Sequence, residues 1–145
     1  MTNKQILVLN KMAETIQAIS GISYVGLYPE AVGKIGQRYP AVIIMDSDES
    51  APAYNAGQEV IYDYQIDCIL HTELRLGITR IADVLDLQNK IITAIITDLS
   101  LTNLVHNITG HSVTKGETHN VLNDTASGYQ GEITTRTITF NVQTS

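Results

Sequence analysis

The sequence predicts an α+β fold: a mixed, largely antiparallel β-sheet of about four to five strands, with two main helices packed on it and one long protruding hairpin. Two segments repeat apolar residues every three or four positions, as amphipathic helices do. A third segment, Glu59–Thr72, alternates apolar and polar residues, as a half-buried strand does. Because each element has one apolar face to bury, they need one another to form a core. We expect a single domain over residues 1–145.

The first helix is predicted over Lys4–Ser20, where apolar residues recur at helical spacing and Gly21 provides a C-terminal stop. Its apolar stripe comprises Ile6, Leu9, Met12, Ala13, Ile16 and Ile19. Ser23–Tyr28 is rich in β-branched and aromatic residues and begins a short β-hairpin region. Pro29–Tyr39 contains two glycines and is expected to be a loop. Ala41–Met45 is a continuous apolar run, which predicts a strand buried on both faces.

The next stretch, Asp46–Gly57, is acidic and turn-rich, so we expect an exposed loop between two strands. The apolar side of the following strand carries Val60, Tyr62, Tyr64, Ile66, Cys68 and Leu70. Fourteen residues at about 3.3 Å each span roughly 45 Å, which is more than a domain of this size needs. We therefore expect Glu59–Thr72 to pair antiparallel with Ala41–Asp46, and its start to protrude together with the acidic loop.

The second half of the chain predicts one helix and two strands. The helix is expected over Thr79–Leu99, with an apolar face made of Ile78, Ile81, Ala82, Leu85, Ile91, Ile92, Ile95 and Leu99. Leu104–Thr114 and Ile133–Val142 are rich in Thr, Val and Ile, as strands prefer. Between them, the polar and glycine-containing segment Lys115–Gly131 is expected to be a flexible loop.

Composition argues against several classes of protein. The formal net charge of −6 disfavours a general nucleic-acid binder, which needs a basic surface to displace phosphate counterions. Cys68 is the single cysteine, which excludes an intrachain disulfide and fits a reducing compartment. The first residues lack a basic segment followed by an apolar stretch, and the longest apolar runs are too short to cross a bilayer. We expect a soluble chain that is not exported. Only 17% of the residues are charged, a surface that is easier to desolvate against another subunit.

Motifs for catalysis and cofactors are not convincing. Gly33-Lys34 lacks the spacing of a phosphate-binding loop, so a turn is the simpler interpretation. The acidic run at Asp46 resembles the start of a calcium loop but lacks the later glycine and glutamate. Cys68 lies on an apolar strand face, where a buried hydrophobic role is favoured over a nucleophile. Four histidines lack the paired spacing of zinc ligands: His71, His106, His111 and His119. We expect no enzyme, and no catalytic, cofactor-binding or metal residues.

The order of elements resembles the tail terminator, or tail-completion, proteins of long-tailed bacteriophages. The resemblance covers most of the chain. It rests on the helix that leads into ISGISYVGLYP, the strand PAVIIMD with its acidic loop, and the alternating strand EVIYDYQIDCILHT. It continues with the helix exit TAIITDLSLTNLV and the final strand GYQGEITTRTITFNV. The similarity is one of order and composition, and neighbouring head–tail joining proteins share it.

The resemblance implies a structural virion protein of the tail or neck that is assembled in the bacterial cytoplasm. Such proteins form a ring, usually of six copies, that caps the finished tail tube, stops its polymerisation and provides the docking surface for the head. The implied partners are further copies of the chain, the tail tube protein and a head-completion or connector protein. DNA would pass through the ring without specific binding, and no membrane is involved.

Two alternatives remain open: a head-completion or connector adaptor of the same neck, and a small cytoplasmic enzyme or ligand-binding domain. The acidic residues on exposed loops and polar strand faces are the candidates for facing the lumen or a partner: Asp46, Asp48, Glu49, Asp63 and Asp67. For each of them, a role in solubility alone is the competing interpretation.

Overall fold

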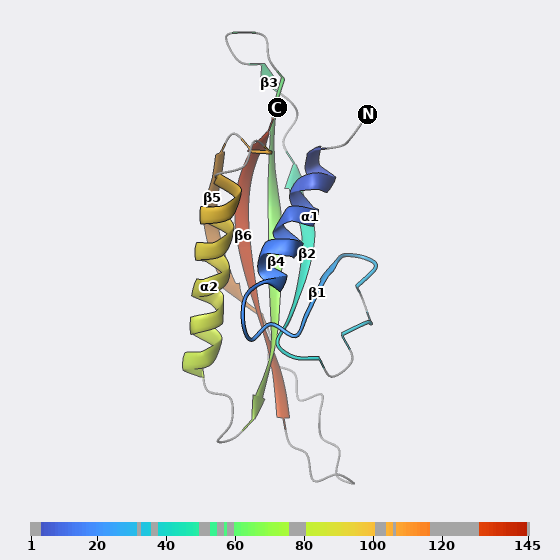
Figure 1. The fold of residues 1–145 in the computed structure, drawn as a ribbon, viewed down its shortest axis with the longest axis vertical. Helices are drawn as coiled ribbons and strands as arrows, with labels where there is room; N and C mark the ends of the chain where they lie inside the picture. Colours follow the sequence, from blue (N-terminus) through green and yellow to red (C-terminus); the bar gives the residue numbers. More distant parts are fainter. Residues whose placement is uncertain are drawn as a thin grey trace.

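In the computed structural model, two helices lie side by side on one face of a long, twisted sheet (Figure 1). The structure describes residues 4–31, 33–35, 38–49, 53–54, 57, 60–75, 81–100, 104–105, 107–116 and 131–144. In chain order the elements are α1 (Lys4–Gln17), β1 (Tyr24–Leu27), β2 (Ala41–Glu49), β3 (Ala53–Tyr54), β4 (Val60–Arg75), α2 (Ile81–Ser100), β5 (Asn107–Lys115) and β6 (Gly131–Thr144). This is the α+β architecture that the sequence predicts.

The sheet has the strand order β1-β2-β4-β6-β5, and β3 pairs with the start of β4. All pairings are antiparallel except that of β1 with β2, which is parallel. The two longest strands, β4 with 16 residues and β6 with 14, are paired along almost their whole length and form the centre of the sheet. The expected antiparallel pairing of Ala41–Asp46 with the long strand is confirmed.

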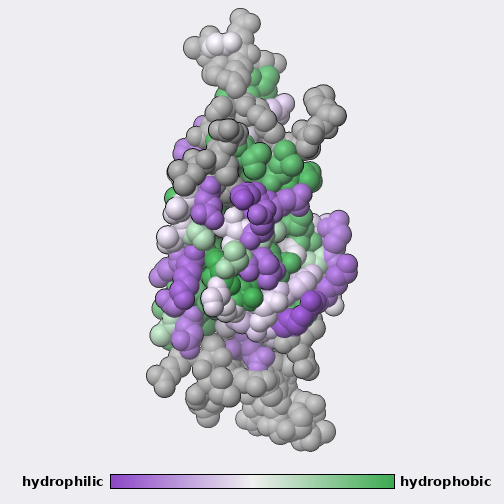
Figure 2. Space-filling model, in the orientation of Figure 1, coloured by the Kyte–Doolittle hydropathy of each residue, from purple (hydrophilic) through white to green (hydrophobic). Residues whose placement is uncertain are grey.

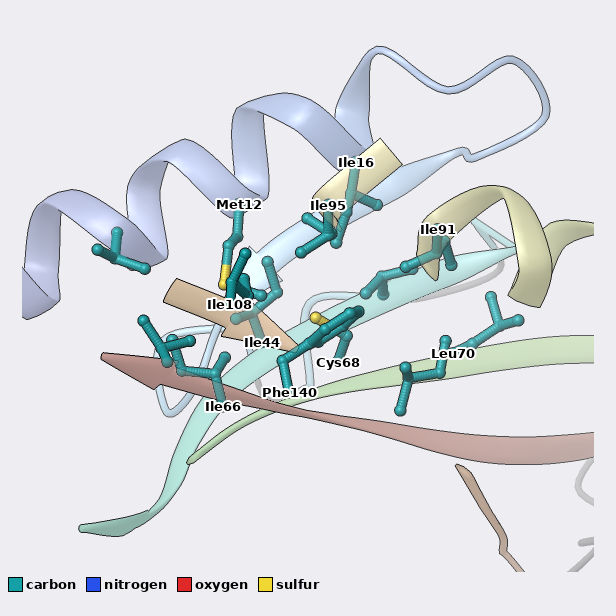
Figure 3. Packing of buried hydrophobic residues seen from close by; sticks show 14 of the residues in the cluster. Met12, Ile16, Ile44, Ile66, Cys68, Leu70, Ile91, Ile95, Ile108 and Phe140 are labelled. Carbon is teal, nitrogen blue, oxygen red and sulfur yellow. The ribbon is translucent and has the colours of Figure 1, made fainter. Parts of the chain in front are cut away.

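The core lies between the helices and the even-numbered side of β4 (Figure 3). Ile66, Cys68 and Leu70 are completely buried there, which confirms the face predicted from the period-two alternation. The helices complete this core from the other side. Each contributes three completely buried side chains: Val8, Met12 and Ile16 from α1, and Val84, Ile91 and Ile95 from α2. The three- and four-residue spacing in each set places these side chains on one stripe of a helix, which is why both helices pack along the sheet.

The predicted hairpin near the start of the chain is wrong. β1 runs parallel to β2, with Tyr24 opposite Ala41 and Leu27 opposite Ile44. A parallel neighbour requires the chain to return to the end at which β1 began, and residues 28–40 make that connection. A hairpin would have required a short turn, which this long connection does not provide.

The predicted boundary of the acidic loop is also wrong. β2 continues through Asp46 to Glu49, four residues beyond the apolar run, because β4 is long enough to pair with it there. Past this point β3 pairs with Val60 and Ile61, and the hairpin extends beyond the ends of the helices, as expected (Figure 1). The expected loop Lys115–Gly131 lies mostly outside the described residues, but Lys115 itself belongs to β5.

The first turns of α2 are not packed as predicted. Ile81 is 53% exposed and Leu85 is 40% exposed, although both were assigned to the apolar face. The buried stripe begins only at Val84 and continues through Ile91 and Ile95. Ile81, one turn before Val84, extends the stripe beyond the part of the helix that is covered, whereas Leu85, the residue after Val84, is turned to the side of it. Hydrophobic side chains also reach the surface over the start of α1, where Ile6 is 51% exposed (Figure 2).

Candidate functional site

The face of the sheet opposite α1 and α2 carries a continuous set of polar side chains. Residues that lie directly opposite each other on antiparallel strands point to the same side of the sheet, so the register identifies the set. We call it the polar face and define it by Asp48, Asp63, Gln65, Asp67, Asn107, Thr109, Thr139, Asn141 and Gln143. It spans β2, β4, β6 and β5, and none of its nine members is basic.

Two carboxylates of the polar face are held by neutral donors on the neighbouring strand. The Thr139 hydroxyl donates to Asp67 Oδ1 at 2.7 Å, and Gln143 Nε2 donates to Asp63 Oδ1 at 2.9 Å. In both cases the two residues are direct cross-strand partners. A hydroxyl or an amide orients a carboxylate without neutralising it, so this face keeps its negative charge.

The polar face is hollowed at the end nearest the β2–β4 hairpin. The hollow has a volume of about 320 Å³ and is lined by residues of four strands: Asp48, Glu49, Asp63, Tyr64, Gln65, Asn107, Thr109, Asn141, Val142 and Gln143. Its carboxylates come from β2 and β4, and its amides come mainly from β5 and β6. The lining can accept and donate hydrogen bonds, but it contains no nucleophile with an adjacent base.

The five acidic residues predicted as candidates do not all lie together. Asp48, Asp63 and Asp67 share the polar face, whereas Asp46 lies opposite Ile66 and therefore on the other side of the sheet. The cause is a β-bulge between Asp46 and Asp48, which adds one residue to β2 and changes the side on which the following residues lie.

Glu49 lies at the margin of the hollow. It is opposite Tyr64 in the register, on the helix side of the sheet, and its Oε1 accepts a hydrogen bond from Gln5 Nε2 of α1 at 3.0 Å. Its backbone N–H donates to Asp48 Oδ1 at 2.9 Å. Glu49 therefore connects the end of β2 to the first helix and contributes to the hollow only from its edge.

Sequence reasoning missed the neutral donors of this face. Thr139 and Gln143 belong to the alternating run at the end of the chain, which signals a strand with one polar side. The alternation does not reveal which aspartate lies opposite which donor, because the register depends on how β4 and β6 are aligned. It also gives no sign that Arg136 is buried on the apolar side of β6.

A metal or cofactor finds little support in the part of the chain that the structure describes. Within it, no group of three or more His, Cys, Asp or Glu residues is arranged to hold a metal ion. His71 lies on β4 and is partly buried, and burial lowers its pKa. Cys68 is completely buried, as predicted, and burial raises the pKa of its thiol. His106 and His119 lie outside the described residues.

The comparisons with known proteins do not assign the chain to a family. No protein-family model matches it, and a search of curated proteins finds no match. Among the described helices, none is long and apolar enough to cross a membrane.

Proposed function

We propose that this protein is the subunit of a hexameric ring that caps the tail tube of a long-tailed bacteriophage, stops its polymerisation and provides the docking surface for the head. The observation that supports the proposal most directly is the polar face, whose nine members on four strands include three aspartates and neither lysine nor arginine. The agreement between the observed α+β layout and the layout that the resemblance implies is a second support.

The charge of the polar face suits the lining of a channel for DNA. Asp63 and Asp67 are oriented by Gln143 and Thr139, which leave both carboxylates negative. A negative lining repels the phosphate backbone, whereas lysine or arginine would retain DNA through counterion release. Six copies would carry a formal charge of about −36, from −6 per chain.

The two edges of the sheet suit a ring built from one kind of contact. Among the described strands, β1 forms one edge and β5 forms the other, so the edges differ in sequence and length. Contacts between two different surfaces of identical subunits are heterologous, and they close into a ring when the rotation allows it. Most described side chains of β5 are exposed, and only the terminal Lys115 is charged among them, so the desolvation cost of covering this edge is small.

The first test is the native mass of the protein, alone and in the presence of the tail tube protein of the same virion. We expect a species near 95 kDa, about six times the 15.9 kDa chain, and rings with an open centre in electron micrographs. A chain that remains monomeric at high concentration and in the presence of the tube protein would contradict the proposal.

The second test asks which side of the sheet faces the channel. In a Cys68→Ala background, Asn107→Cys places a thiol on the polar face. Asn89→Cys places a matched thiol at an exposed position of α2. In the ring, a small maleimide should label both positions, and a large polyethylene-glycol maleimide should label only position 89. Equal labelling of both positions by the large reagent would show that the polar face is not the channel lining.

A further inference from the structure

A pair of basic residues lies on the side of the sheet that the helices cover. Arg136 of β6 and Lys115 of β5 are direct cross-strand partners, so their side chains leave the sheet on the same side. Neither forms an ion pair with a carboxylate among the described residues. Like charges directly opposite each other repel, which is unexpected in a chain whose net charge is −6.

Arg136 is also buried, and no carboxylate of the described residues pairs with it. Only 7% of its surface is exposed. Its Nη1 donates to Gln88 Oε1 at 3.2 Å, and this acceptor is a neutral amide. Its Nε is buried and has no hydrogen-bond partner in the described part of the chain. A buried guanidinium normally has a carboxylate or another anion beside it, because its lost hydration must be replaced.

A third donor lies next to Arg136, on the strand that flanks β6 on the side away from Lys115. Thr72 of β4 is 2% exposed, and its Oγ1 has no hydrogen-bond partner among the described residues. In the register Leu70 lies opposite Arg136 and Thr72 lies opposite Thr134, so Thr72 is the diagonal neighbour of Arg136 on the same side of the sheet. A guanidinium, an ammonium and a hydroxyl thus come from three adjacent strands, and two of these groups are buried with unmet donors.

We propose that Arg136, Lys115 and Thr72 form a binding site for a small oxyanion of the phosphate class. Two oxygens of such an ion can accept from the guanidinium fork, a third can accept from the ammonium or the hydroxyl, and its charge removes the repulsion between the two cations. The ion enters from the edge of the sheet past the exposed Lys115, because Arg136 is too deeply buried to be reached by a carboxylate on a rigid partner surface. The site lies on the opposite side of the sheet from the polar face, and its assignment does not rest on the proposed ring.

Thermal unfolding in phosphate and in chloride at equal ionic strength tests this site. We expect the melting temperature of the wild type to rise with phosphate and to saturate, by roughly 3–6 °C at about ten times the Kd. General exclusion of phosphate from the protein surface also stabilises proteins, but it grows with concentration without saturating. A rise without saturation in the wild type would therefore overturn the proposal.

Variants identify the residues responsible. Lys115→Gln should remove the saturating rise and, in chloride, should melt no lower than the wild type because it relieves the repulsion. Lys90→Gln is the matched control, since Lys90 is an exposed lysine paired with Asp86 at 3.1 Å, and it should keep the rise. Arg136→Gln should also lose the saturating increase of the melting temperature with phosphate. If Arg136→Gln fails to fold, the result for Lys115→Gln alone tests the site. The same saturating rise in Lys115→Gln as in the wild type would refute the site.

Discussion

Replacing Ile95 by alanine tests whether α2 holds the sheet through its buried stripe. Ile95 is completely buried in the core between α2 and the sheet (Figure 3). The substitution removes three carbon groups, and at about 0.8 kcal/mol for each the lost transfer free energy is about 2.4 kcal/mol. The cavity that remains adds to this loss, so the total falls at about 2.5–5 kcal/mol.

Ile81 provides a control of the same residue type on the same helix. It is 53% exposed, so Ile81→Ala removes little buried surface, and alanine is the better helix former. We expect its effect on the free energy of unfolding to stay within about 0.5 kcal/mol. The comparison separates the effect of packing from the effect of the substitution itself.

Urea unfolding followed by circular dichroism gives both free energies. With an m-value of about 1.5–3 kcal/mol/M, Ile95→Ala should lower the midpoint by roughly 1–3 M while leaving the slope unchanged. A loss below about 0.5 kcal/mol, or a loss equal to that of Ile81→Ala, would refute the packing of α2 described here. A large loss in Ile81→Ala that appears only at high protein concentration would instead indicate that the exposed first turn of α2 is covered in an oligomer.

Two further predictions concern the backbone and the pH dependence of stability. Gly116→Ala should lower the free energy of unfolding by about 1–3 kcal/mol, because the new Cβ would lie 1.7 Å from Thr135 Oγ1. Gly110→Ala is the control and should cost clearly less, because its Cβ would meet only Ile96 Cδ1, at 4.0 Å. Equal losses of stability in urea unfolding would contradict this prediction. Burial raises the pKa of Tyr64 to about 12 and also raises the pKa of Cys68. The folded state therefore retains protons that the unfolded state loses, so the free energy of unfolding should fall as the pH rises above about 9. Tyr64→Phe should flatten the part of this fall between pH 10 and 12, and an unchanged curve would show that Tyr64 does not contribute.

The sequence was sufficient to predict the buried side of those helices and strands in which apolar residues recur at a regular spacing. The alternation around Cys68 predicts which side of β4 is buried, and the spacing of Met12 and Ile16 predicts the buried stripe of α1. These predictions succeed because an apolar residue on the wrong side of a long strand or helix would leave the core incomplete. The same reasoning fails at the start of α2, where Ile81 continues the apolar pattern beyond the part of the helix that the sheet covers.

The failures share a physical cause, which is that they depend on contacts between distant segments. The parallel pairing of β1 depends on where residues 28–40 return the chain, and local propensity does not contain this information. The extension of β2 to Glu49 depends on the length of β4, which offers pairing partners to an otherwise polar segment. The separation of Asp46 from Asp48 depends on a single bulge, which no periodic pattern predicts.

The requirements of folding differ between the two sides of this sheet, and this difference bears on function. The helix side must supply apolar side chains, and Ile66, Cys68 and Leu70 meet that need. The polar face has no such constraint, yet it pairs Asp63 with Gln143 and Asp67 with Thr139 across the two central strands. Cross-strand pairs between a carboxylate and a neutral donor contribute little to stability, and a lysine opposite each aspartate would serve at least as well. Neutral donors leave the face negative, which is the property that the proposed channel lining would need in order not to retain DNA.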